Sequence, residues 1–308
     1  MATYSPSMPR IDTLLGVHFT GYPSYVPAHE PSNLRNAAMA KDTLPAISEH
    51  GAKGEIAELY ADIRQTLNVS AINYVWRHIA TIDGGLRWAW QAAKPMFVSG
   101  RVESECGHLQ AQLDYPQLPS LSDTTLSLVG VRAEGRDTIG AILDTYNRGN
   151  LLNMVSLSAL LAESVAPPAG PRPRADLPST DLPLPPIPEV AELSDEISDQ
   201  VLALNALGAK PGPNRVVASI YKHIALWPGY LSVAWVQLAA MHEDGSLLRL
   251  IEDTQDKARR HAAYLAGDLG PRPDGPVADQ VRRTVFEFTD TVIARMIPIG
   301  QMLRQSLA

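Results

Sequence analysis

Two histidines occur in the same local context, and imidazole is the side chain that most readily exchanges protons near neutral pH. His78 and His223 each precede an Ile-Ala pair inside an otherwise apolar stretch. Either could act as a general base, or could be a core histidine bonded to a backbone group. With one acidic residue the pair could also bind a metal, but neither has a second ligand at helical spacing. We therefore expect no metal and no cofactor.

A polar run, Tyr-Asn-Arg-Gly-Asn, interrupts a long apolar pattern near the middle of the chain. Tyr146 and Asn150 are four residues apart, and Asn147 lies three residues before Asn150, so on a helix these side chains share one face. One interpretation is a polar helix junction that ends at Gly149. The other is a site in which an amide holds a water molecule or a substrate oxygen. The sequence leaves both interpretations open.

A repeat with a constant offset of 145 residues relates the two halves of the chain (223 − 78 = 145). Within a segment of fifteen residues, ungapped identities link His, Ile, Ala, Gly, Leu, Ala and Trp of one half to the same types in the other. The last of these pairs is Trp90 and Trp235 (235 − 90 = 145). This pattern predicts a tandem duplication folded as an intramolecular pseudo-dimer, with a ligand site between the halves.

The elements that must position these residues are predicted to be helices. Apolar residues recur at three- and four-residue steps in both halves, and no run of alternating β-branched residues indicates a strand. Nine prolines among residues 166–188 exclude regular structure there, because proline lacks an amide hydrogen and fixes φ. We predict an all-α protein with four parts: an irregular N-terminal arm (1–44), a first helical repeat (45–165), a proline-rich linker (166–188) and a second helical repeat (189–308).

Specific helix boundaries follow from the same pattern. A turn near Gly135 separates a helical stretch at 122–133 from another at 136–164. In the second half, the helical period continues through 277–307, and Pro228 marks a break between two earlier helices.

Composition and charge narrow the classes of function. The net charge is 26 − 33 = −7 and no basic run occurs, which argues against nucleic-acid binding and against an anionic membrane surface. The single cysteine, Cys106, excludes an internal disulfide and a cysteine-rich zinc site. The most apolar stretch, 216–241, contains Lys222 and Pro228, so we expect no membrane span, and the N-terminus has no apolar signal core. We expect a cytoplasmic protein that acts on a small molecule; a homodimer is compatible with the sequence.

Five segments resemble the group I 2-haloacid dehalogenases, the family that acts on both D and L substrates. In chain order they are GEIAELYADIRQTLNV, RHIATIDGGLRWAW, TYNRGNLLNMVSLSALL, HIALWPGYL and FEFTDTVIARMI. The resemblance extends from about residue 45 to the end of the chain and rests on the order and spacing of the segments. It implies an all-α fold of two repeats with the active site between them. It also implies hydrolysis by direct attack of an activated water on C2, with inversion and halide release.

The resemblance assigns roles to particular residues. In the family, an aspartate early in a helix of the second repeat acts as the base, and an asparagine at the end of the first repeat positions the water. The asparagine matches Asn150, whereas the aspartate position falls on Ile220, beside Ser219, which matches the family. No Asp or Glu lies between Asp199 and Glu243, so a small shift of the alignment does not restore the base.

Two further family positions form an aromatic wall of the pocket and fall on Ala71 and Tyr74, of which only Tyr74 is aromatic. His223 lies one helical turn beyond Ile220 on the same face and is the candidate substitute base. We therefore predict Asn150 and His223 as catalytic residues. The candidates for substrate contact are Ser219, Ile220, Tyr74, Ala71, His78 and Tyr146.

Three functions stay open. The first is a dehalogenase-like hydrolase that directs water onto a small (2-halo)carboxylic acid or a related metabolite. The second is an enzyme of the same fold redirected to a larger, more apolar metabolite by a non-hydrolytic reaction such as that of a lyase, isomerase or cyclase, because Ala71 and Ile220 make the pocket roomier or less polar. The third is a non-catalytic small-molecule-binding protein with structural histidines. The lining of the cavity between the repeats discriminates among them.

Overall fold

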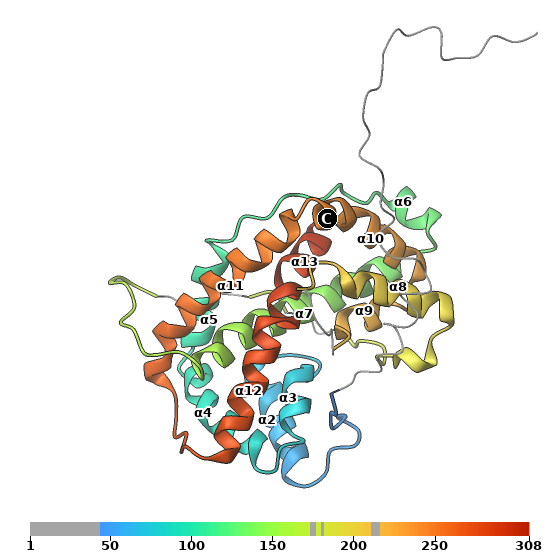
Figure 1. Ribbon diagram of the computed structural model, residues 1–308. Helices are drawn as coiled ribbons and strands as arrows, with labels where there is room; N and C mark the ends of the chain where they lie inside the picture. The colour runs from blue at the N-terminus through green and yellow to red at the C-terminus, as the bar shows by residue number, and fades with distance from the viewer. Residues whose placement is uncertain (1–43, 173–176, 180–181, 211–215, 308) are drawn as a thin grey trace, which may run out of the picture.

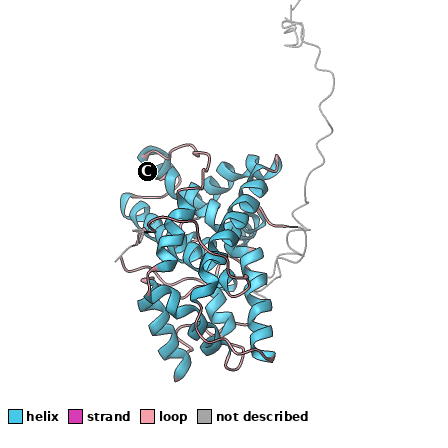
Figure 2. Ribbon diagram, turned by 90° about the vertical axis from the view of Figure 1, so that its left-hand side faces the viewer, coloured by secondary structure: helices cyan, strands magenta, loops and turns pink. Residues whose placement is uncertain are grey.

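The computed structural model describes residues 44–172, 177–179, 182–210 and 216–307. The predicted N-terminal arm, 1–44, lies outside these residues except for Leu44. Within the described ranges every regular element is a helix and no strand occurs (Figure 2), which confirms the all-α prediction. No helix in this part of the chain is both long and apolar enough to cross a membrane.

The described residues form α-helices and two short 3-10 helices, η2 and η3 (Figure 1). In chain order they are α2 (Glu55–Leu67), α3 (Tyr74–Ile79), α4 (Gly85–Val98), α5 (Arg101–Gln110), α6 (Asp123–Leu128), α7 (Ala133–Ala159), η2 (Val190–Glu192), α8 (Asp195–Ala206), α9 (Ser219–Ile224), α10 (Pro228–Glu243), α11 (Ser246–Leu265), η3 (Ala266–Asp268), α12 (Pro276–Asp290) and α13 (Val292–Ser306).

Two helix boundaries differ from the predicted ones. The turn between α6 and α7 lies at 129–132, and α7 continues without interruption through Gly135. A Cβ at Gly135 would lie 2.7 Å from Nε1 of Trp227, so this glycine allows close packing and does not end a helix. The helical period at 277–307 belongs to two helices, because Thr291 has φ −121° and ψ −94°, outside the helical region.

Helix α7 is the central element of the fold. It runs through the middle of the body in Figure 1, and α5, α9, α11, α12 and α13 pack against it. From Ile139 to Ala159 all of its residues are buried except Asp144. A polar side chain on this helix must find its partners inside the protein, because a buried polar group left unpaired costs about 1–3 kcal/mol.

The order of the helices repeats with the offset seen in the sequence. Helices α3 and α9 both span six residues and start 145 residues apart (219 − 74), and α5 and α11 also start 145 residues apart (246 − 101). The two matched tryptophans nevertheless differ, because Trp90 is 2% exposed and Trp235 is 41% exposed. The pseudo-dimer therefore stays a prediction, which the order of the helices favours and this pair of residues opposes.

The described part of the proline-rich linker forms no helix and is bonded to both halves. Arg172 donates from Nη1 to both carboxylate oxygens of Glu105 on α5, at 2.8 and 2.7 Å. The carbonyl of Pro185 accepts a hydrogen bond of 2.8 Å from Nε2 of His223 on α9. The linker thus reaches the helix that carries the predicted base.

Candidate functional site

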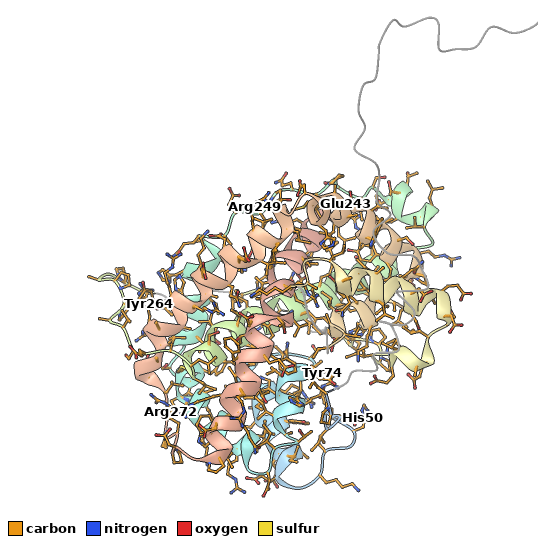
Figure 3. All side chains as sticks on the ribbon, in the orientation of Figure 1. His50, Tyr74, Glu243, Arg249, Tyr264 and Arg272 are labelled. Atoms are coloured by element: carbon orange, nitrogen blue, oxygen red, sulfur yellow. The ribbon has the colours of Figure 1, made fainter. Side chains whose placement is uncertain are left out.

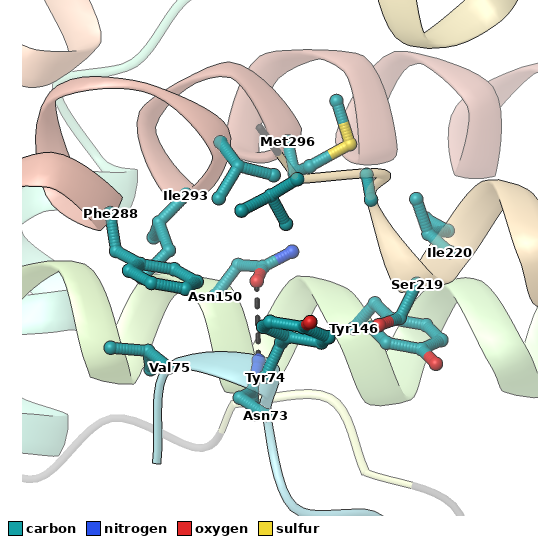
Figure 4. A pocket seen from close by; sticks show the side chains of 13 residues that line it. Asn73, Tyr74, Val75, Tyr146, Asn150, Ser219, Ile220, Phe288, Ile293 and Met296 are labelled. Carbon is teal, nitrogen blue, oxygen red and sulfur yellow. Dashed lines mark hydrogen bonds between the residues drawn. The ribbon is translucent and has the colours of Figure 1, made fainter. Parts of the chain in front are cut away.

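A small cavity lies where α3, α7, α9, α12 and α13 meet (Figure 4). Its volume is about 30 Å³, which accommodates about one or two water molecules. Most of the lining side chains are apolar, and amide and hydroxyl groups supply the polar atoms. The lining residues are Asn73, Tyr74, Val75, Tyr146, Asn150, Val216, Ala218, Ser219, Ile220, Phe288, Val292, Ile293 and Met296.

Two segments that are 145 residues apart line this cavity together. Residues 73–75 come from the start of α3 and residues 218–220 from the start of α9 (218 − 73 = 145). The backbone takes a similar course before each helix, with φ −57° and ψ 147° at Asn73, and φ −59° and ψ 123° at Ala218. Matching positions of the sequence repeat therefore meet at one place in the fold.

The ring of Tyr74 connects α3 with the second half of the chain (Figure 3). It stacks on Phe288 of α12 with ring centroids 6.0 Å apart, and its hydroxyl donates a hydrogen bond of 2.7 Å to the carbonyl of Leu44. The guanidinium of Arg77 lies 5.0 Å from the ring centroid and the ammonium of Lys222 lies 5.9 Å from it. Cations at these distances are attracted to an aromatic face. The wall that Tyr74 contributes is thereby held in place from both halves.

Asn150 projects from α7 into the cavity and is 6% exposed. Its Oδ1 accepts a hydrogen bond of 3.2 Å from Nδ2 of Asn73, which leaves the Asn150 amide nitrogen on the side away from Asn73 (Figure 4). The polar run is not a helix junction, because α7 continues through it. Gly149 lets the two asparagines approach, since a Cβ there would lie 2.7 Å from Oδ1 of Asn73. The Asn150 amide nitrogen could therefore donate to the oxygen of a molecule bound in the cavity.

The hydroxyl of Ser219 is the second polar group that this cavity can satisfy. Its Oγ is buried and has no hydrogen-bond partner among the described residues. Buried hydroxyls in folded proteins are almost always hydrogen-bonded, to protein or to ordered water. A water molecule or a substrate oxygen in the cavity would complete the hydrogen bonding of Ser219.

His223 does not line the cavity but lies behind Tyr146. Its Nε2 donates to the carbonyl of Pro185 at 2.8 Å, and its Nδ1 lies 3.5 Å from the Tyr146 hydroxyl. A carbonyl only accepts, so the proton of the neutral ring is on Nε2 and the lone pair of Nδ1 faces the phenol. Burial lowers the pKa of His223, and the bond to Pro185 offsets this only in part. The ring is therefore a neutral acceptor whose contact with the cavity passes through Tyr146.

His78 also bonds to a prolyl carbonyl and does not line the cavity. Its Nδ1 donates to Pro45 at 2.6 Å, and its ring lies 5.7 Å from that of Phe288. Each matched histidine thus bonds a prolyl carbonyl close to the start of its repeat, His78 that of Pro45 at the first residue of the first repeat and His223 that of Pro185 near the end of the linker. This geometry favours the structural interpretation of the histidine pair. The catalytic role of His223 stays a prediction.

We expect His223→Gln to remove a pH-dependent part of the stability. Because burial lowers the folded-state pKa below its ordinary value of 6.5, the unfolded chain binds more protons as the pH falls below that value. The free energy of unfolding of the wild type should decrease as the pH falls from about 7 to about 5, and decrease less in the variant. Denaturant titrations at both pH values measure this, with exposed His50→Gln as the control. Equal slopes in all three proteins would contradict the assignment.

The structure brings together five of the residues predicted to form the site, and leaves three outside it. Those that line the cavity are Asn150, Tyr146, Tyr74, Ser219 and Ile220. Those that do not are His223, His78 and Ala71. Sequence reasoning missed Asn73, although the 145-residue offset from Ala218 points to it. It also missed the α12–α13 wall, formed by Phe288, Val292, Ile293 and Met296.

No group of three or more His, Cys, Asp or Glu side chains in the described part of the chain could hold a metal ion. The donors around the cavity are amides and hydroxyls, together with the histidine behind Tyr146. What they can do is hold a water molecule and move a proton.

No protein-family model matches the chain. Two curated proteins are similar to it in sequence, and both are configuration-inverting 2-haloacid dehalogenases. The one from Alcaligenes xylosoxydans xylosoxydans is 25% identical over 207 residues, which cover 64% of this chain and 68% of the relative. The one from Pseudomonas sp. (strain 113) is 28% identical over 199 residues, which cover 62% of this chain and 65%, just under two thirds, of the relative. The chain is therefore homologous, at low identity, to configuration-inverting 2-haloacid dehalogenases.

Solved structures share the fold. A complex of D-2-haloacid dehalogenase with L-LA has a TM-score of 0.66 at 19% identity, covering 86% of this chain and 96% of that chain. A complex of a mutant D-2-haloacid dehalogenase with D-2-CPA has a TM-score of 0.62 at 19% identity, covering 85% and 94%. At this identity the likeness shows the helical fold alone.

Proposed function

We propose that the protein is a dehalogenase-like hydrolase in which Asn150 holds a water molecule for attack on C2 of a small (2-halo)carboxylic acid. The observation that carries the proposal is the place of Asn150 in the cavity at which residues 73–75 and 218–220 meet. Because Asn73 holds its amide oxygen, the Asn150 amide nitrogen is oriented to donate to an oxygen of water or substrate. Homology to configuration-inverting enzymes supports direct displacement by water, since one displacement inverts the carbon.

We further propose that the chain is a diverged relative of the group I (D,L-acting) enzymes that lacks their catalytic aspartate. In the resemblance, the aspartate position falls on Ile220, which lines the cavity and is 1% exposed. Isoleucine cannot accept a proton, and no carboxylate is among the described residues that line this cavity. A positioned general base contributes roughly 10²–10⁴-fold to a rate. Hydrolysis is therefore slow compared with that of an enzyme that has such a base.

The proton acceptor that the proposal assigns is His223, reached through the Tyr146 hydroxyl. As the water oxygen attacks C2, the C2–halogen bond breaks and the halide leaves with its electron pair. The phenol takes one proton from the water and gives its own proton to Nδ1 of His223, so the tyrosine ends unchanged and the imidazole becomes charged. The 3.5 Å separation of these two atoms makes the path a long one. Burial disfavours the charged imidazole, which is a second reason to expect a slow reaction.

Both enzymatic functions need the cavity of about 30 Å³ to enlarge, because this volume holds one or two water molecules and not an organic acid as well. The redirected enzyme needs the greater enlargement, because Ala71 lies outside the lining and Phe288 and Met296 form the α12–α13 side of the cavity (Figure 4). The other alternative, a non-catalytic binding protein, requires only that the same polar groups hold a ligand. A measurement of turnover distinguishes it from the hydrolase.

Chloride release from D- and L-2-chloropropionate, measured by ion chromatography, tests the proposal. We expect the wild type to release chloride above the uncatalysed rate, but about 10²–10⁴-fold more slowly than an enzyme with a positioned base. Asn150→Ala should reduce this to background, whereas Gln305→Ala, which removes an exposed amide on α13, should not. No release by the wild type, or undiminished release by Asn150→Ala, would overturn the hydrolase. Chloride release as fast as that of an enzyme with a positioned base would contradict the slow hydrolysis that we expect because residue 220 is isoleucine.

A further inference from the structure

A second concave site lies at the C-terminal ends of α7 and α12, beside α11. Figure 1 shows the end of α7, in yellow-green, between α11 and α12. The groove has a volume of about 450 Å³, within the range of sites that hold small organic ligands. It shares no lining residue with the cavity around Asn150, and its Ser158 lies eight residues, about 12 Å, further along α7. It is a separate site that the proposed hydrolysis does not use.

Two large apolar side chains from separate parts of the chain line this groove. Phe286 of α12 is 56% exposed, and Leu161, just beyond the end of α7, is 39% exposed. Single exposed apolar residues are common, but here two of them line the same groove. An apolar group lying between them would be removed from water on both sides.

The charged residues that line the groove are one cation, Arg259, and one anion, Asp290. The carboxylate of Asp290 accepts from Lys210 at 3.0 Å on one oxygen, and from Arg259 and Gln255 at 2.8 Å each on the other. Asp290 is therefore shared between two cations. Arg259 is 44% exposed at its side chain and has five N–H donors in all, so it can also bind an anion from outside.

A buried hydroxyl at the groove points to a polar ligand group as well. Ser158 is 5% exposed and lines the groove, and its Oγ is buried without a hydrogen-bond partner among the described residues. Such groups are rare in folded proteins unless a ligand or an ordered water completes them. A serine hydroxyl can donate to an oxygen of a ligand.

We propose that this groove binds an amphipathic carboxylate, with its tail between Phe286 and Leu161 and its carboxylate on Arg259 and Ser158. Arg259 matches a carboxylate because the planar guanidinium offers paired donors to its two oxygens. A medium-chain fatty acid or an arylalkanoic acid has this combination of tail and head. A second copy of this chain is the competing occupant, and it would give the donors of Ser158 and Arg259 no specific role.

The test uses the full chain, octanoate as the ligand and 8-anilinonaphthalene-1-sulfonate as a fluorescent amphipathic anion. We expect saturable binding of the dye to one site, with displacement by octanoate. Octanol, which has the same tail and no charge, should displace it at least about tenfold less well. Arg259→Gln and Phe286→Ser should each weaken octanoate binding at least about tenfold. Val236→Ser, at a residue of α10 that is 69% exposed and lies outside the groove, should leave it unchanged.

Three results would overturn the proposal. One is equal octanoate binding by the groove variants and Val236→Ser, with all of them folded by circular dichroism. Another is equal displacement by octanol and octanoate, because the charge would then have no role. The third is a dimer in the wild type that Phe286→Ser dissociates, since a second copy would then occupy the groove. Chloride release is measured for the same groove variants. A failure of octanoate binding can then be distinguished from a failure of the proposed hydrolysis.

Discussion

Glu105→Ala is expected to destabilise the protein by about 3–5 kcal/mol, the usual cost of removing one partner from a buried ion pair. Glu105 is fully buried on α5. Its Oε2 accepts from Nδ1 of His261 at 2.8 Å, and both of its oxygens accept from Arg172. Without the carboxylate, the Arg172 guanidinium and the His261 ring lose their buried acceptor. Urea or guanidinium titration near pH 7 measures the loss.

The same carboxylate makes the stability depend on pH. Burial alone would raise the pKa of Glu105, but the bonds from His261 and Arg172 outweigh it, and the pKa lies below its ordinary value of 4.5. A lowered folded-state pKa contributes stability that is fully present above the unfolded-state pKa and is lost as the pH falls from that value through the folded-state pKa. The difference in free energy of unfolding between wild type and Glu105→Ala should therefore shrink below about pH 4.5.

Exposed Glu252→Ala is the control, with an expected change in free energy of unfolding of about 0.5 kcal/mol or less. A loss below about 1 kcal/mol in Glu105→Ala would contradict the account.

The sequence predicted the kind of fold because helical periodicity is a local property of the chain. The period of apolar residues predicts helices in both halves, and the nine prolines of 166–188 exclude one from the linker. The period does not predict the break at Thr291, and it predicts a turn at Gly135, which lies inside α7. Gly149, one interpretation of which is a helix end, also lies inside α7. At each position a Cβ would approach a neighbouring side chain too closely, that of Trp227 at Gly135 and that of Asn73 at Gly149. The type of residue alone does not distinguish a helix end from a close contact.

The candidate site could be predicted only where the sequence repeat or the resemblance marked it. Asn150, Ser219 and Ile220 lie together, although 70 residues separate Asn150 from Ile220. The wall that contains Phe288 carries no polar motif and is visible only when α12 packs against α3. His223 is on the expected helix, but the Pro185 carbonyl of the linker draws its ring away from the cavity. A hydrogen bond to a distant backbone carbonyl cannot be predicted from the sequence around His223.

The central claim is that the cavity around Asn150 is a hydrolytic site that lacks a base at residue 220. If so, Ile220→Asp should raise chloride release from 2-chloropropionate by about 10²-fold or more over the wild type, because a positioned base contributes roughly 10²–10⁴-fold. The side chains of Ile220 and Asn150 line the same cavity (Figure 4), so we expect a carboxylate at 220 to act on a water that the amide holds. Ile220→Asn is the matched control, since it has nearly the shape of aspartate but cannot accept the proton. Ser219→Asp places a carboxylate beside the same position and serves as a second variant if a charge at the buried residue 220 lowers stability.

The initial rate of chloride release by Ile220→Asp, compared with Ile220→Asn and the wild type, tests this claim most directly. Both substitutions put a polar group at a residue that is 1% exposed, so thermal unfolding of each variant accompanies the assay. We expect a faster rate in Ile220→Asp alone, and loss of that gain when Asn150→Ala is added. Equal rates in folded Ile220→Asp and Ile220→Asn, with no gain in Ser219→Asp, would contradict it.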